Sequence, residues 1–198
     1  MTKINFKPEN TAIVKGNSAS AVMLINDIAG AEKILDYGCG AGRNIKYILD
    51  NTANIIVHGT DIVEQLEKEK ERHDQLRGAG CTIEASEQLE KNSYDKILNS
   101  HVLNVIESDE VKSLVVKDIY DKLKEGGKAY FEVRTKRDVE SSKTKEVYGD
   151  GYKIKKGNSF TYQEALTKEK ITLLLEGNGF NIVDHICNSS KHIITAVK

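Results

Sequence analysis

The sequence is poor in the features that mark secreted, membrane-bound and metal-stapled proteins. Its three cysteines are odd in number and widely spaced, and no two form a CxxC pair, so neither a disulfide framework nor a zinc site is expected. The five histidines also lack the spacing of metal ligands. No signal-peptide-like apolar segment starts the chain, and no apolar run approaches a membrane span. These absences predict a soluble, cytoplasmic protein with reduced thiols.

The sequence also lacks an excess of positive or negative charge. The chain has 29 basic and 30 acidic side chains, which gives a formal charge of −1. Attraction of the whole chain to nucleic acid or to a membrane is therefore not expected, although a local patch can still act. Hydrophobic residues make up 39% and charged residues 30% of the 198 positions, as in a folded single domain. Internal repeats and low-complexity segments are not visible.

The chain has one proline, Pro8, and most of the turns between its predicted segments are marked by glycines. Short apolar runs, which we interpret as strands, alternate with segments of helical period. The runs lie at 33–36, 54–61, 81–84, 94–99, 128–134, 180–184 and 192–197. Helices are expected at 63–77, 108–124 and 167–176. In the segment 108–124 an apolar stripe predicts the buried face: Val111, Leu114, Val115, Ile119 and Leu123.

This alternation predicts an α/β fold in which helices cover both faces of a mostly parallel sheet. The last two runs are joined by too few residues for a crossover helix, so they are expected to be antiparallel. The sequence therefore predicts a seven-stranded sheet whose last strand runs against the others.

The strongest motif is a glycine loop at the end of the first strand, Leu35-Asp36-Tyr37-Gly38-Cys39-Gly40-Ala41-Gly42. Glycines let the backbone approach a ligand closely, and ligands of open α/β sheets bind at the carboxyl ends of strands. Asp36 would repel a pyrophosphate there and suits a positively charged group. Asp61 ends the next strand, where a carboxylate can accept two hydrogen bonds from a ribose diol, each contributing about 1.5–3 kcal/mol. Together these features predict a nucleoside ligand with a cationic, non-phosphorylated tail.

These residues resemble the class I S-adenosylmethionine-dependent methyltransferases. The loop 35–42 resembles their first motif, Asp61 the acid after their second strand, 94–99 their fourth motif and 123–129 the turn before their fifth strand. The resemblance implies a Rossmann-like fold, the cofactor S-adenosyl-L-methionine and in-line transfer of a methyl group to a small-molecule or nucleic-acid acceptor.

A narrower resemblance joins the segments 11–15, 101–106, 132–134 and 159–163 to a group of phage and bacterial methyltransferases. Some members of that group are described as DNA-phosphorothioation-associated. Lys15 stands where a basic pair of that group is expected.

The resemblance implies a cofactor site made by the glycine loop, the two acids and their neighbours. Its expected members are Lys15, Asp36, Gly38, Cys39, Gly40, Gly42, Asn44, Asp61, Ile62, Ser86 and Asn99. Within it, Asp36 would orient the methionine amino group, Asp61 would hold the ribose, and Ile62 would pack on the adenine.

The end of the fourth predicted strand is expected to face the methyl group. His101 is the candidate general base there, because imidazole titrates near neutrality. Alternatively, it caps a strand or bonds a carbonyl. Asn99 is the second catalytic candidate, as a positioning group. The Asn-Pro-Pro-Tyr sequence of amino-methylating DNA enzymes and the Pro-Cys nucleophile of cytosine C5 enzymes are missing, which disfavours both of those chemistries.

Residues 134–156 carry eight basic and four acidic side chains. The segment follows the fifth strand, where it can cover the site as a lid or arm for an anionic substrate, or simply be a solvated loop. Four nearby aromatic residues can stack on a ring or form a small core of their own. They are Tyr148, Tyr152, Phe160 and Tyr162.

The expected organisation is one methyltransferase domain over residues 1–198. Its expected parts are an N-terminal helical or substrate segment (1–30), a cofactor-binding core (31–134), a basic lid or substrate arm (135–162), and a C-terminal helix with an antiparallel strand pair (163–198).

Two alternatives remain open at the level of sequence. One is a nicotinamide-dependent oxidoreductase, but the loop lacks the last step of the dinucleotide fingerprint and Asp36 disfavours a pyrophosphate. The other is a non-catalytic S-adenosylmethionine-binding module that keeps the fold.

Overall fold

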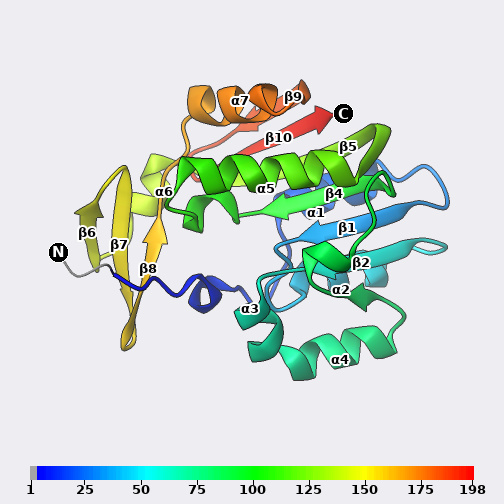
Figure 1. Ribbon diagram of the computed structural model, residues 1–198, viewed down its shortest axis with the longest axis horizontal. Helices are drawn as coiled ribbons and strands as arrows, with labels where there is room; N and C mark the ends of the chain where they lie inside the picture. Colours follow the sequence, from blue (N-terminus) through cyan, green and yellow to red (C-terminus); the bar gives the residue numbers. More distant parts are fainter. Residues whose placement is uncertain (1–3) are drawn as a thin grey trace.

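The main sheet has seven strands in the order β3-β2-β1-β4-β5-β10-β9 (Figure 1). The computed structural model describes residues 4–198. The strands of the sheet are β1 (Lys33–Tyr37), β2 (Ile56–Thr60), β3 (Thr82–Ile83), β4 (Tyr94–Ser100), β5 (Leu123–Arg134), β9 (Asn181–Cys187) and β10 (Lys191–Val197). The first five pair in parallel, and β10 runs antiparallel to both of its neighbours. The predicted seven-stranded, Rossmann-like sheet with a reversed last strand is confirmed.

Helices cover both faces of this sheet. Successive side chains of a strand point to opposite faces, and both faces are apolar, so each has to be buried under helices. Leu35, Ile97 and Phe131 pack under α5 (Asp109–Lys122) and α7 (Lys168–Gly177). Ile34 and Leu98 pack on the other face, under α1 (Ala19–Asn26) and α2 (Arg43–Asn51). The remaining helical segments are η1 (Pro8–Thr11), α3 (Val63–Lys68), α4 (Lys70–Gly78), η2 (Ser86–Gln88), η3 (Leu103–Val105) and α6 (Lys136–Glu140). Within residues 4–198, no helix is long and apolar enough to cross a bilayer.

The face that α5 buries matches the predicted apolar stripe only at Val115, Ile119 and Leu123. Val111 and Leu114 are 45% and 69% exposed, whereas Lys112 is fully buried. The Nζ of Lys112 lies 2.5 Å from Glu164 Oε2 and 2.7 Å from Asp109 Oδ1. A buried ion pair with a distant segment therefore decides part of the orientation of this helix, which the apolar period of the helix alone does not show.

A second, three-stranded antiparallel sheet occupies the segment that was expected to be a lid, an arm or a loop. Its strands are β6 (Lys145–Tyr148), β7 (Gly151–Lys156) and β8 (Ser159–Gln163). It lies beyond the carboxyl ends of β1 and β4 (Figure 1). The ring of Phe6 meets those of Tyr148 and Tyr162 edge-on, with centroids 5.2 and 5.8 Å apart. Part of the aromatic group thus forms a small core, one of the two expected outcomes.

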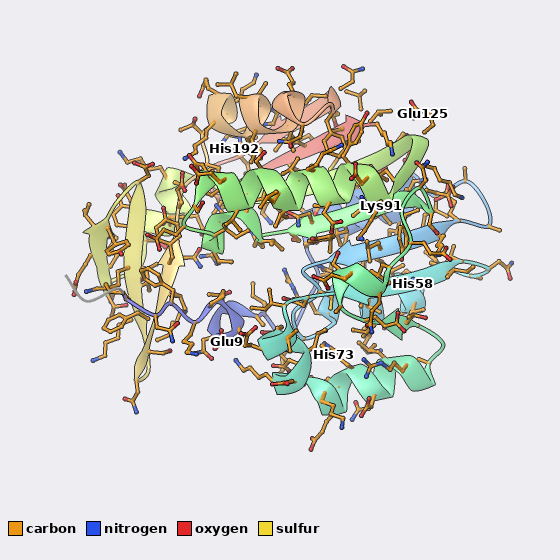
Figure 2. All side chains as sticks on the ribbon, in the orientation of Figure 1. Glu9, His58, His73, Lys91, Glu125 and His192 are labelled. Atoms are coloured by element: carbon orange, nitrogen blue, oxygen red, sulfur yellow. The ribbon has the colours of Figure 1, made fainter. Side chains whose placement is uncertain are left out.

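The segment 6–13 crosses from the small sheet to α3, and Figure 2 labels Glu9 on it. At one end, the Lys7 N–H donates to the carbonyl of Phe160 at 2.9 Å. At the other, Lys68 Nζ donates to the Glu9 carbonyl at 2.6 Å and to Asn10 Oδ1 at 2.9 Å. The segment is therefore fastened on both sides of the carboxyl edge of the main sheet.

Candidate active site

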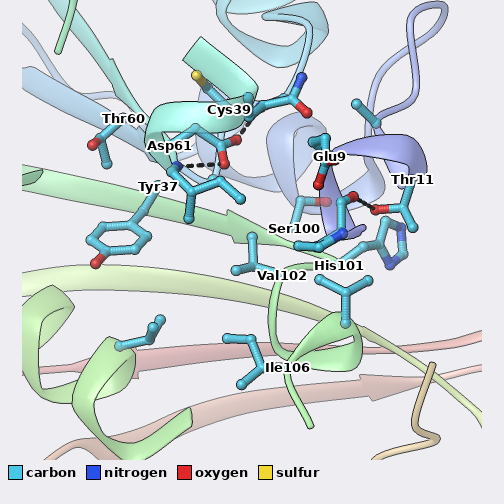
Figure 3. A pocket seen from close by; sticks show the side chains of 18 of the residues that line it. Glu9, Thr11, Tyr37, Cys39, Thr60, Asp61, Ser100, His101, Val102 and Ile106 are labelled. Atoms are coloured by element: carbon cyan, nitrogen blue, oxygen red, sulfur yellow. Dashed lines mark hydrogen bonds between the residues drawn. The ribbon is translucent and has the colours of Figure 1, made fainter. Parts of the chain in front are cut away.

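A cavity of about 610 Å³ opens at the carboxyl ends of β1, β2 and β4 (Figure 3). The glycine loop and the residues after β2 form one wall, and the segment 6–13 and the end of β8 form others. This is the size of a small-molecule site. Of the predicted site residues, those that line it are Gly38, Cys39, Gly40, Asn44, Asp61, Ile62, Ser86 and His101.

The glycine loop is held against the end of β2 by its own backbone. The N–H groups of Gly38 and Cys39 both donate to the carbonyl of Thr60, at 2.8 and 2.9 Å. Gly38 has φ +82°, and a Cβ atom there would lie 2.1 Å from Val102 Cγ2. Only glycine fits this position, because the left-handed backbone and the neighbouring side chain both exclude a Cβ. The loop thereby presents bare backbone to the cavity.

Asp61 points to the glycine loop. Its Oδ2 accepts the Gly40 N–H at 2.7 Å, and its Oδ1 accepts the Ile62 N–H at 2.8 Å. Burial raises its pKa despite these two bonds. Each carboxylate oxygen has room for a further donor, so the group can still receive two hydroxyls.

Asp36 is fully buried just before the loop, and it does not line the cavity. Neither of its carboxylate oxygens has a hydrogen-bond partner in the described chain. Burial, followed by the negative charge of Asp61, raises its pKa to about 7. The positive charge of Arg43 acts in the opposite direction and offsets part of this effect. A buried carboxylate without a hydrogen-bond partner beside a second acid is costly, and a further cation would relieve more of that cost.

Arg43 is a site residue that the sequence analysis missed. It begins α2 directly after the loop, it lines the cavity, and burial lowers its pKa. The negative charges of Asp36 and Glu132 act against this lowering of the Arg43 pKa. The position of Arg43 one residue after the last loop glycine was the signal that could have found it, since such a cation suits a carboxylate.

His101 follows β4 directly and lines the cavity, where Figure 3 labels it. Its Nε2 lies 3.1 Å from Oε1 of Glu132, a fully buried residue of β5. Burial alone would raise the pKa of Glu132, but hydrogen bonds from His101, Lys191 and the Ser20 N–H hold it well below its usual range. The sequence analysis names the segment 132–134 but assigns no role to Glu132.

Four predicted residues lie outside the cavity lining: Lys15, Asp36, Gly42 and Asn99. Asn99 is buried, and its Nδ2 donates to the Tyr37 carbonyl at 3.1 Å, which joins β4 to β1. Its role beside the methyl group stays a prediction. Gly42 faces α4, because a Cβ there would lie 2.2 Å from Leu76 Cδ1. Lys15 is exposed.

Among the members that do line the cavity, Cys39 is buried and the hydroxyl of Ser86 is bonded to another residue. Burial raises the pKa of the Cys39 thiol well above its usual value, so it stays neutral. Ser86 Oγ donates to Asp118 Oδ2 at 2.5 Å. In the part of the chain that the structure describes, no group of three or more His, Cys, Asp or Glu side chains is arranged to hold a metal ion.

The basic segment 134–156 reaches the cavity through the side chain of Arg134. Arg134 lines the cavity, with its Nε 3.2 Å from Asp138 Oδ2. Lys153 pairs with Glu146 at 2.5 Å, so part of the positive charge is neutralised inside the segment. An anionic substrate bound by the whole segment stays a prediction.

Known proteins share this architecture. Residues 35–129 match the family model described as a methyltransferase domain. No curated protein matches the chain significantly in sequence. Among solved structures, the Burkholderia thailandensis 1,6-didemethyltoxoflavin-N1-methyltransferase, with bound 1,6-didemethyltoxoflavin and S-adenosylhomocysteine, is 21% identical with a TM-score of 0.67, over 90% of this chain and 76% of that one.

Two further structures are similar at lower identity. A SAM-dependent methyltransferase from Methanosarcina mazei is 16% identical with a TM-score of 0.67, over 89% of this chain and 96% of that one. The PH0226 protein from Pyrococcus horikoshii OT3 is 16% identical with a TM-score of 0.73, over 89% and 86%. The chain therefore has the fold of the class I S-adenosylmethionine-dependent methyltransferases, and its residues 35–129 match their methyltransferase-domain family.

Proposed function

We propose that the protein binds S-adenosyl-L-methionine in this cavity and transfers its methyl group to an acceptor bound beside it. The observation that carries the proposal is the pair of neighbouring acids at the glycine loop. Asp36 is buried without a partner, and Asp61 has oxygens left for two hydroxyls. Such a site suits a nucleoside whose tail is positively charged.

The residues present fit the parts of this cofactor. Asp61 would accept from the ribose hydroxyls, and Ile62, which is 46% exposed in the cavity wall, would pack against the adenine. The negative charge of Asp36 favours the ammonium of the methionine part, and Arg43 would pair with its carboxylate. When bound, the cofactor supplies a methyl group on a sulfonium, which is already activated for transfer. The protein then has to align the acceptor and exclude water, and alignment alone can contribute roughly 7–11 kcal/mol.

The nicotinamide alternative is disfavoured by the same charges. A pyrophosphate at the loop would meet the two acids, and the N–H groups of Gly38, Cys39 and Gly40 are already bonded to Thr60 and Asp61. The non-catalytic alternative is separated by experiment, because such a module would bind the cofactor without consuming it.

A methyl-transfer screen tests the proposal. The full chain is incubated with the cofactor carrying a radiolabelled methyl group and with separate fractions of small molecules, DNA, RNA and protein. We expect label to appear in one fraction, and to be lost with Asp61→Ala. Cofactor binding without transfer to any fraction would instead support the non-catalytic module.

Membership of the phage and bacterial DNA-phosphorothioation-associated group stays a prediction. Label in the DNA fraction would support it. The cytoplasmic location stays a prediction as well.

A further inference from the structure

His101 is held in an unusual backbone conformation by one residue of the neighbouring strand. Its φ is +63°, a left-handed value that costs a side-chain-bearing residue energy and persists where its surroundings impose it. Its N–H donates to the carbonyl of Glu132 at 2.7 Å, and its ring Nε2 lies 3.1 Å from the carboxylate of the same residue. Glu132 thus fixes both the backbone and the ring of His101.

The carboxylate of Glu132 is itself firmly anchored. Its Oε2 accepts the Ser20 N–H at 2.8 Å, and its Oε1 lies 2.7 Å from Lys191 Nζ. Its side chain is fully buried. A charged carboxylate can only accept hydrogen bonds, so the ring nitrogen that faces it carries a proton. When the ring of His101 is neutral, Nε2 is therefore the nitrogen that carries the proton.

The other ring nitrogen is left with a free lone pair. Nδ1 of His101 is buried and has no hydrogen-bond partner among residues 4–198, in a residue that lines the cavity. Ser100 Oγ and Gln163 Oε1, which belong to two other lining residues, are also buried there without partners. Unpaired buried acceptors at a cavity are costly unless a ligand supplies donors.

We propose that Glu132 is a positioning residue that holds His101 in the Nε2–H form, so that Nδ1 takes the proton of the acceptor, and that the acceptor is a small molecule methylated at an O–H or N–H group. This inference rests on the proposed function. The size of the cavity and the rings of Phe6 and Tyr162 in its lining fit a small, flat molecule better than a polymer.

Methyl transfer to the acceptor breaks two bonds and forms two. The acceptor loses its proton to Nδ1, and the electron pair of the broken bond forms the new bond to the methyl carbon. The electrons of the old sulfur–carbon bond stay on the sulfur as a thioether. The resulting imidazolium is stabilised by the charge of Glu132 until it returns its proton to water.

The first test reads the tautomer directly and needs neither cofactor nor acceptor. Nitrogen-15 spectra of the histidine side chains are recorded on the full chain, above the titration range of the rings. The signals of His101 are assigned by their loss in His101→Gln, since the chain has only five histidines. We expect protonated Nε2 and unprotonated Nδ1. The opposite tautomer in the wild-type protein would overturn the inference.

Variants of the partners extend this test. Glu132→Gln should abolish the preference for one tautomer, whereas Lys191→Gln, which removes another partner of the same carboxylate, should preserve it. An unchanged tautomer in a folded Glu132→Gln protein would contradict the positioning role. If that variant does not fold, the wild-type spectrum still decides.

Binding and turnover separate this inference from the proposed function. The probe for binding is S-adenosylhomocysteine: failure of the wild-type chain to bind it overturns the proposed function, whatever the tautomer. With an acceptor found in the screen, His101→Gln should lower kcat by about 10²–10⁴-fold and leave the Kd of S-adenosylhomocysteine within about twofold. Glu132→Gln should lower kcat at least about tenfold at unchanged KM. A wild-type kcat in either variant would overturn this inference and leave the proposed function standing.

Discussion

The carboxylate of Asp61 accepts the backbone N–H of Gly40 at 2.7 Å, and this bond ties the end of β2 to the glycine loop after β1. The same carboxylate accepts the Ile62 N–H at 2.8 Å. One acidic side chain thus orders the loop and keeps lone pairs for a ligand, so changes to it should affect affinity first.

Asp61→Ala is expected to weaken binding of S-adenosylhomocysteine by about tenfold or more, because it removes charge-assisted hydrogen bonds to the ribose and an anchor of the loop. Isothermal calorimetry measures the change. Asp50→Ala serves as the control, since within residues 4–198 the carboxylate of Asp50 pairs only with Lys46, on the exposed side of α2. Equal affinities of Asp61→Ala and wild type would remove Asp61 from the site.

Asp36→Asn should stabilise the free protein in a pH-dependent way. The pKa of Asp36 is about 7 in the folded chain and ordinarily 3.8. Below 3.8 the group is protonated in both states and costs nothing; between 3.8 and 7 only the unfolded chain loses the proton, so stability falls as pH rises. Above 7 the cost is complete, on the order of 4 kcal/mol.

Urea unfolding at pH 5 and pH 8 measures this effect. The gain from Asp36→Asn should be larger at pH 8. Asp95→Asn should instead destabilise the protein. Burial opposes, but hydrogen bonds from Lys124 and the Lys33 N–H lower the pKa of Asp95, so its stabilising contribution is present at both pH 5 and pH 8. A gain from Asp36→Asn that is equal at both pH values would show that Asp36 titrates normally.

Gly42→Ala should destabilise the protein more than Gly16→Ala. Both glycines have nearly the same left-handed backbone, with φ +76° and +78°, and this strain costs roughly 1–2 kcal/mol in each variant. Gly16 has open space around it, whereas a Cβ at Gly42 would lie 2.2 Å from Leu76 Cδ1. The additional overpacking cost is about 1–3 kcal/mol. Equal unfolding free energies would mean that α4 moves aside freely.

Lys112→Met should cost about 3–5 kcal/mol of stability, because it breaks a buried ion pair with Glu164. Lys170→Met removes a second partner of the same carboxylate, but Lys170 is partly exposed, so the cost should be at most about 1 kcal/mol. Thermal unfolding of the two variants compares them directly. A larger loss in Lys170→Met would reverse the assignment of the buried pair.

The sequence predicted the main sheet and the positions of the two acids at the ends of β1 and β2, because both depend on local pattern. Apolar runs mark strands, and the spacing of Asp36 and Asp61 from the ends of those runs places them at one edge of the sheet. The roles of Glu132 and Lys112 could not be predicted this way. Each acts through residues far away in the chain, such as His101 and Glu164.

The small sheet was missed for a related reason. The short strand β6 is mostly exposed, and β7 is rich in lysine, so neither shows a clear apolar alternation. The third strand, β8, is mostly buried but has only five residues. Asn99 was placed at the methyl group because it ends a strand, but its amide is used to join β4 to Tyr37. End-of-strand position alone does not say which way a side chain points.

Calorimetric titration of the full chain with S-adenosylmethionine, S-adenosylhomocysteine and NADH tests the central claim most directly. We expect the first two to bind at one site per chain and NADH to give no measurable heat. Binding of NADH without binding of either sulfur compound would contradict the account.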